Sequence, residues 1–299
     1  ILGFKLQYEM SYTKIINMLD LANIPVLSKD RGEEWPLLIG GGPCAFNPEP
    51  LADVFDAFII GDGEEAILEV CKTYIQNKQE NGTKEQFLKS VCVKDGVYVP
   101  AFYEPVYNED GTIKEILKKY DAAPSTVRKA LIHDIEAAPF PENPIVPLIE
   151  TVHDRAVVET FRGCTRGCRF CQAGMVYRPV RERSKGKIID LAVKQLTSTG
   201  HEELSLLSLS TSDYSCFEPL ISELMTICKS RNVALSLPSL RLDSFSFKVL
   251  QEMQGFRKSG LTFAPEAGTQ RLRDVINKGI TEEDIYGSIR QALLLGWNN

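Results

Sequence analysis

Three cysteines lie within eight residues, at Cys164, Cys168 and Cys171, in the spacing Cys-x3-Cys-x2-Cys. Arg and Gly stand between them, so the three thiols cannot all project from one regular element, and the pattern indicates a loop around a group that binds thiolates. A closed zinc site needs four ligands, and a four-iron cluster usually has four cysteines. Three thiols favour a metal and leave one iron of a cluster free to bind a small molecule. A zinc ion completed by a distant His or Asp, and a chance grouping, are the alternatives.

The same spacing, with Phe170 directly before the last cysteine, resembles the signature of radical S-adenosylmethionine (radical SAM) enzymes. The resemblance implies a [4Fe-4S] cluster on Cys164, Cys168 and Cys171, whose open iron binds S-adenosylmethionine (AdoMet). It implies that one electron cleaves AdoMet to a 5′-deoxyadenosyl radical, and that the electron comes from a donor such as flavodoxin or ferredoxin. Phe170 would pack on the adenine; a simple loop anchor is the alternative.

Length and composition fit a soluble protein of one large or two ordinary domains, with 299 residues, 43% hydrophobic and 25% charged. Apolar runs such as 292–295 are too short to span a bilayer, so we expect a cytoplasmic protein without a membrane partner. The net charge of −6 disfavours extensive RNA contact. The remaining cysteines are expected to be buried small hydrophobes rather than disulfides: Cys44, Cys71, Cys92, Cys216 and Cys228.

From residue 151 onward, apolar strand patterns alternate with helical ones. Strand patterns start at Leu204, Val233 and Leu261, which are 29 and 28 residues apart (233 − 204 and 261 − 233), a rhythm typical of parallel strands with outer helices. Capping boxes at Ser215-x-x-Glu218 and Thr281-x-x-Asp284 predict two helix starts. The radical SAM core that this half resembles is a partial (β/α)6 barrel. Four of its strands are predicted within 151–299, and the last two are expected beyond Asn299.

Polar residues follow each of the later predicted strands, where a barrel of this kind has its active site. By resemblance, the segment with Ser210 and Asp213 meets the AdoMet amino group or ribose, and Arg241 lies near its carboxylate. Glu266-Ala267-Gly268 resembles the Gln-Ser-Gly of methylthiotransferases, which implies that Glu266 lies near the ribose. The alternative for Glu266 is a capping role at the next helix.

The first 80 residues alternate strands and helices, which predicts a parallel sheet with both faces covered. Two Gly-rich turns follow the strands, containing Gly40, Gly41, Gly42 and Gly61. They resemble the later part of a Rossmann-like cobalamin-binding domain, which implies cobalamin as a further cofactor along these glycines. Ordinary tight turns are the alternative. The loop that carries a cobalt-ligating His in that family would precede Ile1, so we expect a fragment of a longer protein.

Residues 81–150 are expected to join the two domains, 1–80 and 151–299. The segment 91–99, with Asp95-Gly96 at its centre, predicts a β-hairpin, and Asp110-Gly111 marks a further turn. Frequent prolines from residue 122 to 147 predict an extended linker.

The basic strip of residues 162–187 flanks the cysteines and favours an anionic substrate, or is a solvated surface: Arg162, Arg166, Arg169, Arg178, Arg181, Arg183, Lys185 and Lys187. Taken together, the chain resembles B12-binding-domain radical SAM proteins of unassigned substrate. We therefore expect a radical SAM enzyme. Methylthiotransferase-like modification of RNA or protein, and a non-catalytic metal-binding regulatory protein with structural zinc, are the alternatives.

Overall fold

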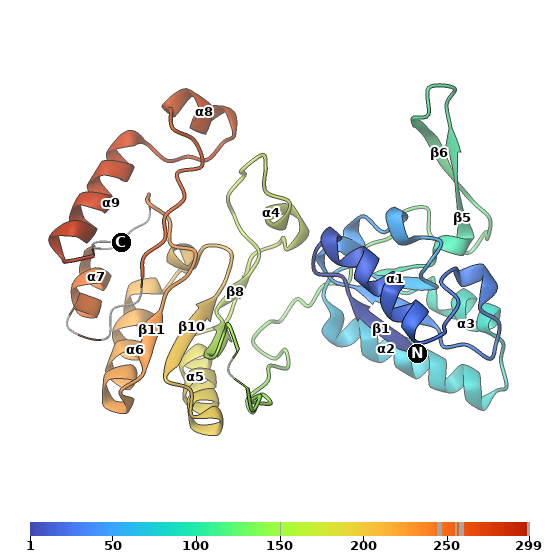
Figure 1. Ribbon diagram of the computed structural model, residues 1–299, viewed down its shortest axis with the longest axis horizontal. Coiled ribbons are helices and arrows are strands. Elements are labelled where there is room, and N and C mark those ends of the chain that lie inside the picture. Colours follow the sequence, from blue (N-terminus) through green and yellow to red (C-terminus); the bar gives the residue numbers. More distant parts are fainter. Residues whose placement is uncertain (150, 244–246, 255, 257–259, 298–299) are drawn as a thin grey trace. The chain divides into compact units, whose positions relative to one another are not determined.

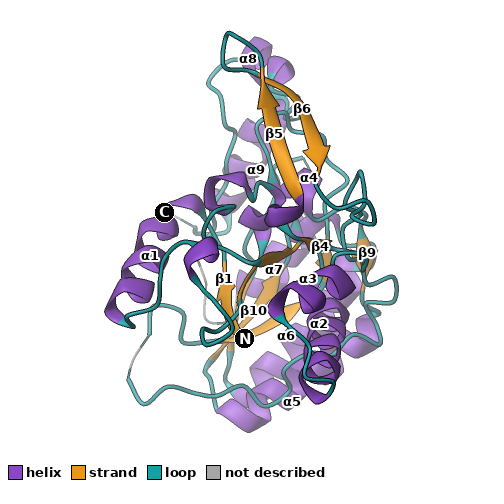
Figure 2. Cartoon of the chain, turned by 90° about the vertical axis from the view of Figure 1, so that its right-hand side faces the viewer, coloured by secondary structure: helices purple, strands orange, loops and turns teal. Residues whose placement is uncertain are grey.

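A computed structural model describes residues 1–149, 151–243, 247–254, 256 and 260–297. The chain divides into two compact units, Ile1–Ile132 and His133–Asn299. Each unit contains its own parallel strands and hydrophobic core (Figures 1 and 2), which confirms the predicted α/β class. In the part of the chain that is described, no helix is both long and apolar enough to cross a membrane.

The first unit is built on a four-stranded sheet in the order β1-β2-β3-β4. The first three strands are parallel, and β4 runs antiparallel to β3. Their bounds are β1 Leu2–Lys5, β2 Leu38–Gly41, β3 Ala57–Ile59 and β4 Val97–Tyr98. The central strands are short apolar runs because helices cover both faces of the sheet.

Two cores lie on the two faces of this sheet. Ile39 and Ile59 pack with helices α2 (Gly63–Gln79) and α3 (Lys84–Val91). The residues before them, Leu38 and Phe58, point to the other face and pack with α1 (Tyr12–Leu21). This period of two along each strand determines which residues face which helix.

The predicted hairpin at 91–99 is wrong. Residues 84–91 form α3, which starts at a capping box between Thr83 and Gln86. That local signal outweighs the alternation of apolar residues around Cys92, because the apolar positions of the helix lie against the core. Only β4 is a strand here, and its partner is β3.

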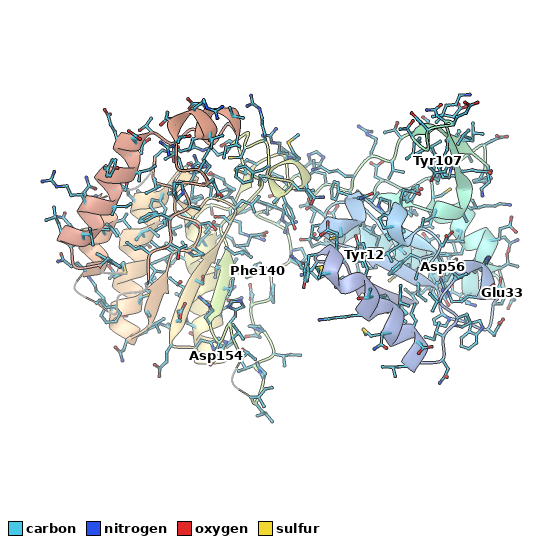
Figure 3. All side chains as sticks on the ribbon, turned by 45° about the horizontal axis from the view of Figure 1, so that its top comes forward. Tyr12, Glu33, Asp56, Tyr107, Phe140 and Asp154 are labelled. Atoms are coloured by element: carbon cyan, nitrogen blue, oxygen red, sulfur yellow. The ribbon has the colours of Figure 1, made fainter. Side chains whose placement is uncertain are left out.

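A hairpin does exist later in the chain, between β5 (Tyr103–Tyr107) and β6 (Ile113–Lys118), with Asp110 and Gly111 in its turn. All six residues of β6 are exposed. Tyr107, labelled in Figure 3, lies on this hairpin.

The second unit has a three-stranded parallel sheet in the order β11-β10-β7. A separate antiparallel pair, β8 with β9, follows β7. The bounds are β7 Ala156–Glu159, β8 Phe161–Arg162, β9 Arg181–Glu182, β10 Glu203–Leu207 and β11 Ala234–Ser236. The predicted strand at 261–264 is not assigned. Leu261 and Phe263 still pack on the core, and Pro265, which follows directly, has no N–H to donate to a neighbouring strand.

Helices run alongside these strands around one core (Figure 1). The helix bounds are α4 Ala173–Val176, α5 Lys185–Thr199, α6 Phe217–Arg231, α7 Phe247–Gln254, α8 Gln270–Val275 and α9 Glu282–Leu294. The Thr281–Asp284 capping box is confirmed at α9. The one predicted at Ser215 is wrong, since its backbone N–H and hydroxyl both donate to Glu182 and Cys216 is the N-cap of α6.

The cysteines outside the loop are free thiols, but their burial differs from the prediction for two of them. Cys216 is exposed and Cys71 is half-buried, whereas Cys44, Cys92 and Cys228 are buried. Burial raises the pKa of the Cys228 thiol to about 11, so this thiol is protonated and behaves as a small apolar side chain.

Residues 135–142, here called the strap, belong to the second unit and are bonded mainly to residues of α5 and the residues just before it. The ring of Phe140 (Figure 3) is stacked by the guanidinium of Arg183 at 5.3 Å, and Arg183 also donates to the Ile135 carbonyl. Gln195 donates to the Pro141 carbonyl at 2.8 Å, and Ser184, Lys194 and Ser198 bond Glu136 or Glu142. The strap precedes β7 in the chain but belongs to the packing of α5.

Candidate functional site

The cysteine loop, residues 163–172, leaves from β8, and the chain returns through α4 to β9. Gly163 has a φ of +96°, and a Cβ there would lie 2.7 Å from the Pro179 carbonyl oxygen, so only glycine lets the chain enter the loop in this way. Cys164, Cys168 and Cys171 are free thiols, each partly exposed. The predicted loop is therefore a loop, and its sulfurs are accessible.

The donor chemistry of this loop fits an iron–sulfur cluster. The backbone N–H of Gly174 donates to the sulfur of Cys171 at 3.3 Å, the kind of contact that tunes cluster thiolates. Within the described residues, no group of three or more His, Cys, Asp or Glu side chains is arranged around a single metal ion. A four-iron cluster offers a separate iron to each thiol, so its ligands need not converge on one point.

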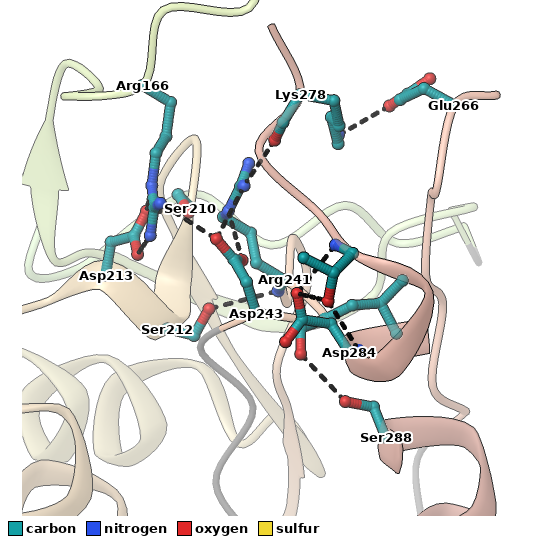
Figure 4. Close-up of polar contacts among 12 residues, drawn as sticks. Arg166, Ser210, Ser212, Asp213, Arg241, Asp243, Glu266, Lys278, Asp284 and Ser288 are labelled. Carbon is teal, nitrogen blue, oxygen red and sulfur yellow. Dashed lines mark hydrogen bonds and ion pairs between the residues drawn. The ribbon is translucent and has the colours of Figure 1, made fainter. Parts of the chain in front are cut away.

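On one side of the loop, four charged residues form an ion-pair network (Figure 4). Arg166 donates to both oxygens of Asp213, with 2.9 Å from Nε and 2.5 Å from Nη2, and to Asp243 at 3.0 Å from Nη1. Asp243 in turn accepts two hydrogen bonds from Arg241, at 2.9 and 3.0 Å. The network comprises two positive and two negative side chains and joins the loop to the carboxyl ends of β10 and β11.

This network shifts the pKa of its members. Burial raises the pKa of the Asp213 carboxyl, but hydrogen bonds from Arg166 and Ser210 and the charges of Arg166 and Arg241 lower it by more, so the net shift is downward. The hydrogen bond to Asp213 raises the pKa of Arg166 against the opposing effect of burial. Both groups are therefore charged at neutral pH.

On its other side, the cysteine loop contacts the end of α8. The Arg169 N–H donates to the Ile276 carbonyl at 2.9 Å, and its guanidinium reaches the Val275 carbonyl. Asn277 donates from Nδ2 to the Gly167 carbonyl at 2.8 Å. The last carbonyls of α8, which lack partners within the helix, are thus bonded by the loop.

Phe170 and Glu266 are brought together through Lys278. The Lys278 ammonium donates to Glu266 Oε1 at 2.9 Å and lies 5.8 Å from the centre of the Phe170 ring. The Lys278 carbonyl accepts from Arg241 at 3.0 Å (Figure 4), so this residue also touches the ion-pair network. Glu266 does not cap α8, whose N-cap is Thr269.

Two residues with unfavourable backbone conformation lie in this part of the second unit, one after β11 and one after the apolar run 261–264. Of the described non-glycine residues with positive φ, four are asparagines, which tolerate this region, and the other two are Ser239 (φ 59°) and Glu266 (φ 66°). Each directly follows a proline, Pro238 or Pro265, which in turn follows a mainly apolar run. Such outliers occur preferentially at functional sites.

Most of the charged side chains in the basic strip form ion pairs or hydrogen bonds within the protein. Arg162 and Arg183 pair with Glu159, Lys185 pairs with Glu223 at 2.7 Å, and Arg178 donates to the carbonyls of Cys164 and Arg166. Arg166 and Arg169 are held as described above, and Arg181 donates to the Pro179 carbonyl. The bonds of Arg166, Arg169 and Arg178 position the loop, and the others join strands and helices of the second unit. The strip therefore does not by itself indicate an anionic ligand.

In the first unit, packing of the chain on itself requires glycine at three of the four positions in the Gly-rich turns. A Cβ at Gly40 would lie 2.9 Å from the ring of Phe58. At Gly42 it would lie 2.8 Å from the Leu6 carbonyl oxygen, and at Gly61 2.1 Å from that of Ala130; both residues have positive φ. Among the four glycines of the two Gly-rich turns, Gly41 has ordinary space, since a Cβ there would lie 3.7 Å from the Ile59 carbonyl oxygen. Packing therefore accounts for the glycines at these positions without a bound ligand, and they give no evidence of a contact with cobalamin.

Sequence reasoning identified Phe170, Ser210, Asp213, Arg241 and Glu266 one by one, and the structure brings them to one edge of the second unit. It did not identify Asp243, Asn277 or the bridging role of Arg166. A signal existed for Asp243, which stands two residues after Arg241 at a predicted strand end. Arg166 and Asp213 are 47 residues apart, and their pairing depends on the tertiary fold.

Two family models match the chain. The one described as "Radical SAM superfamily" matches residues 158–299, and the one described as "Radical SAM proteins, N-terminal" matches residues 1–100. An uncharacterised protein of Methanocaldococcus jannaschii is 27% identical over 303 residues, which cover 97% of this chain and 55% of that protein. An uncharacterised methyltransferase of Pyrococcus horikoshii is 21% identical over 297 residues, covering 93% and 56%. The chain spans about half the length of these relatives.

Solved structures share the fold at low identity. The cobalamin-dependent S-adenosylmethionine radical enzyme OxsB, with aqua-cobalamin and S-adenosylmethionine bound, has a TM-score of 0.64 and 16% identity, over 100% of this chain and 40% of that one. The radical S-adenosylmethionine methyltransferase TsrM from Kitasatospora setae, with tryptophan substrate and a S-adenosylmethionine analogue bound, has a TM-score of 0.58 and 14% identity, covering 98% and 54%.

Proposed function

This chain belongs to the radical SAM superfamily, and from that membership we propose that it is the AdoMet-cleaving part of an enzyme of unassigned substrate. The observation that carries the proposal is the cysteine loop, with three free and partly exposed thiols held at the carboxyl ends of parallel strands. Cys164, Cys168 and Cys171 would hold a [4Fe-4S] cluster. When bound, the cluster supplies one electron that breaks a carbon–sulfur bond of AdoMet and yields methionine and a 5′-deoxyadenosyl radical.

The chain's own residues then bind and orient AdoMet in this proposal. Phe170 is half-exposed, so its ring is available to pack on adenine. The carboxylate of Glu266 is one-third exposed and accepts hydrogen bonds, so it suits the two ribose hydroxyls, while Lys278 holds it in place. Ser210, Asp213 and Arg241 act beside the amino and carboxylate groups of AdoMet, directly or through the residues that they bond.

The test uses the full-length protein that contains this chain, purified and reconstituted with iron and sulfide without oxygen. With a reduced flavodoxin, a reduced ferredoxin or dithionite as electron donor, we expect AdoMet-dependent release of 5′-deoxyadenosine, measured by chromatography. Cys168→Ala should release less than about a hundredth of this amount, because one cluster ligand is lost.

Cys216→Ala is the matched control, since Cys216 is an exposed free thiol outside the loop and should retain full iron and full product. Zinc in place of iron and labile sulfide, with no product from the wild type, would overturn the proposal and favour a structural zinc protein.

We propose cobalamin as a second cofactor, supported by the fold that this chain shares with the cobalamin-dependent enzyme OxsB. Methyl transfer to the substrate is the reaction that this pair of cofactors favours, in line with the names of the methyltransferases above. Purification with hydroxocobalamin should then yield about one cobalamin per chain by absorbance. Protein that releases all cobalamin on gel filtration yet makes 5′-deoxyadenosine would refute this part alone.

A further inference from the structure

We propose that Arg166 is a positioning residue, which fixes the cysteine loop over the carboxyl ends of β10 and β11 through Asp213 and Asp243. The inference rests on the proposed function for its meaning, because the loop that Arg166 holds is the one that would carry the cluster. It assigns Arg166 no contact with AdoMet or with the cluster.

The first support is the number and direction of the bonds. Arg166 lies between Cys164 and Cys168, and all three of its side-chain nitrogens donate to carboxylates: Nε and Nη2 to Asp213, and Nη1 to Asp243. The two aspartates are 47 and 77 residues away in the chain and follow different strands. One side chain therefore ties the loop to two strand ends at once.

The second support is that the aspartates are themselves fixed. Ser210 donates to Asp213 at 2.6 Å, and Arg241 donates twice to Asp243. The Arg241 side chain is only 9% exposed, its backbone N–H donates to Ser212 at 3.2 Å, and its guanidinium also bonds the Lys278 carbonyl (Figure 4). Because Asp213 and Asp243 are themselves held by other residues, they fix the position of the Arg166 guanidinium.

The third support is that the backbone carbonyls of Arg166 and of the next residue are also hydrogen-bonded to other parts of the second unit. Arg178 donates to the Arg166 carbonyl at 2.8 Å, and the next carbonyl, that of Gly167, accepts from Asn277 at 2.8 Å. The stretch between the first two cysteines is thus held from four separate segments of the chain, through Asp213, Asp243, Arg178 and Asn277. A loop that merely covered the strand ends would not need this density of bonds.

The chemistry explains why arginine stands here. A planar guanidinium can bond one carboxylate with two parallel N–H groups and a second with its remaining nitrogen. A lysine ammonium keeps the charge but is a point donor without this geometry. Asp213 and Arg241, which the family resemblance associates with AdoMet, act in this view mainly by holding Arg166 and Asp243.

The test compares Arg166→Gln and Arg166→Lys with the wild type, in the full-length protein. Arg155→Lys is the matched control, because Arg155 also joins a carboxylate of a neighbouring strand, Glu203, at 2.7 Å in the same unit, away from the loop. The first readout is hydrogen–deuterium exchange of the metal-free protein. We expect amides 164–172 to exchange on the order of tenfold faster in Arg166→Gln, partly restored in Arg166→Lys and unchanged in Arg155→Lys.

The second readout is the reconstituted cluster. Arg166→Gln should hold less than about half of the wild-type iron and sulfide, or give an electron paramagnetic resonance signal that AdoMet no longer shifts as in the wild type. If amides 164–172 of Arg166→Gln exchange at the wild-type rate, the proposal is overturned, whatever the iron and sulfide content of the variant. A wild type that takes up no cluster would sink the proposed function, while loop exchange would still decide the role of Arg166.

If Arg166→Gln does not fold, Asp243→Asn gives the same comparison with a smaller change. It weakens the third bond of Arg166 and the two bonds from Arg241, and it leaves both bonds between Arg166 and Asp213. Faster exchange of the loop in this variant supports the proposal, and wild-type exchange overturns it.

Discussion

Both units have residues that resemble cofactor-binding motifs at the carboxyl ends of parallel strands, but the two strand ends are built differently. In the second unit, charged side chains and thiols converge there, and several of them remain partly exposed. In the first unit, glycines stand at the corresponding places, and the space beside three of them is filled by Leu6, Phe58 and Ala130. A glycine motif can therefore report close packing of the chain on itself, whereas converging polar groups that keep some exposure are stronger evidence for a ligand.

The largest effect that tests this comparison is expected from Gly61→Ala. A Cβ at this position would meet the Ala130 carbonyl oxygen at 2.1 Å, and the φ of +111° is unfavourable for alanine. We expect the free energy of unfolding of the first unit to fall by about 2–5 kcal/mol in urea titrations, from overpacking and backbone strain together.

Gly63→Ala is the matched control for that change. It is the first residue of α2, and a Cβ there has no neighbour within 4 Å, so stability should stay the same or rise by up to about 1 kcal/mol. Equal stability of the Gly61 and Gly63 variants would show that packing does not account for Gly61.

A medium effect is expected from Asp213→Asn in the second unit. The variant loses charge-assisted bonds from Arg166, which should cost about 1–3 kcal/mol of stability near pH 7. Because the folded state lowers the pKa of Asp213 below its usual 3.8, the carboxylate stabilises the fold above that pH and loses this contribution as the pH falls through the folded pKa.

The difference between wild type and Asp213→Asn should therefore be largest near neutral pH and shrink below about pH 4, measured by urea unfolding at a series of pH values. A difference that stays constant from pH 7 to pH 3 would contradict the assigned ionisation of this network.

The smallest effect on stability is expected from Gly41→Ala. A Cβ added to this glycine would lie at an ordinary contact distance, 3.7 Å from the Ile59 carbonyl oxygen, and the residue has no positive φ. The free energy of unfolding should change by less than about 1 kcal/mol. If cobalamin passes along this turn, the same variant should retain less cobalamin than the wild type; a loss of stability as large as that of Gly61→Ala would instead place Gly41 among the packed glycines.

The alternation of strands and helices was predictable because burial leaves a period in the sequence. Strands such as 57–59 and 156–159 are apolar runs, and the helix at 282–294 begins at a readable capping box. The predicted hairpin at 91–99 is wrong because the Thr83–Gln86 capping box starts a helix that extends to Val91, and this signal lies outside the alternating segment. The capping box predicted at Ser215 is wrong because the Ser215 hydroxyl donates to Glu182, which is 33 residues away in the chain. Sequence spacing cannot predict such a partner.

For the candidate site, residue types at predicted strand ends could be read from the sequence, since parallel strands place their carboxyl ends at one edge. The pairing of distant residues could not. Arg241 and Asp243 are only two residues apart, so their pairing is local. Whether Arg166 faces solvent or two aspartates depends on contacts with residues 47 and 77 positions away, which no local pattern encodes.

The strap has a consequence for how the chain tolerates being cut. Residues 135–142 are bonded to α5, while the residues just after them are open to solvent, with Ile145 98% and Leu148 107% exposed. A protease that cleaves near residue 148 would sever the backbone without removing any bond of the strap. Residues 133–148 would then stay bound to the rest of the second unit as a noncovalent complex, held by the bonds between the strap and α5.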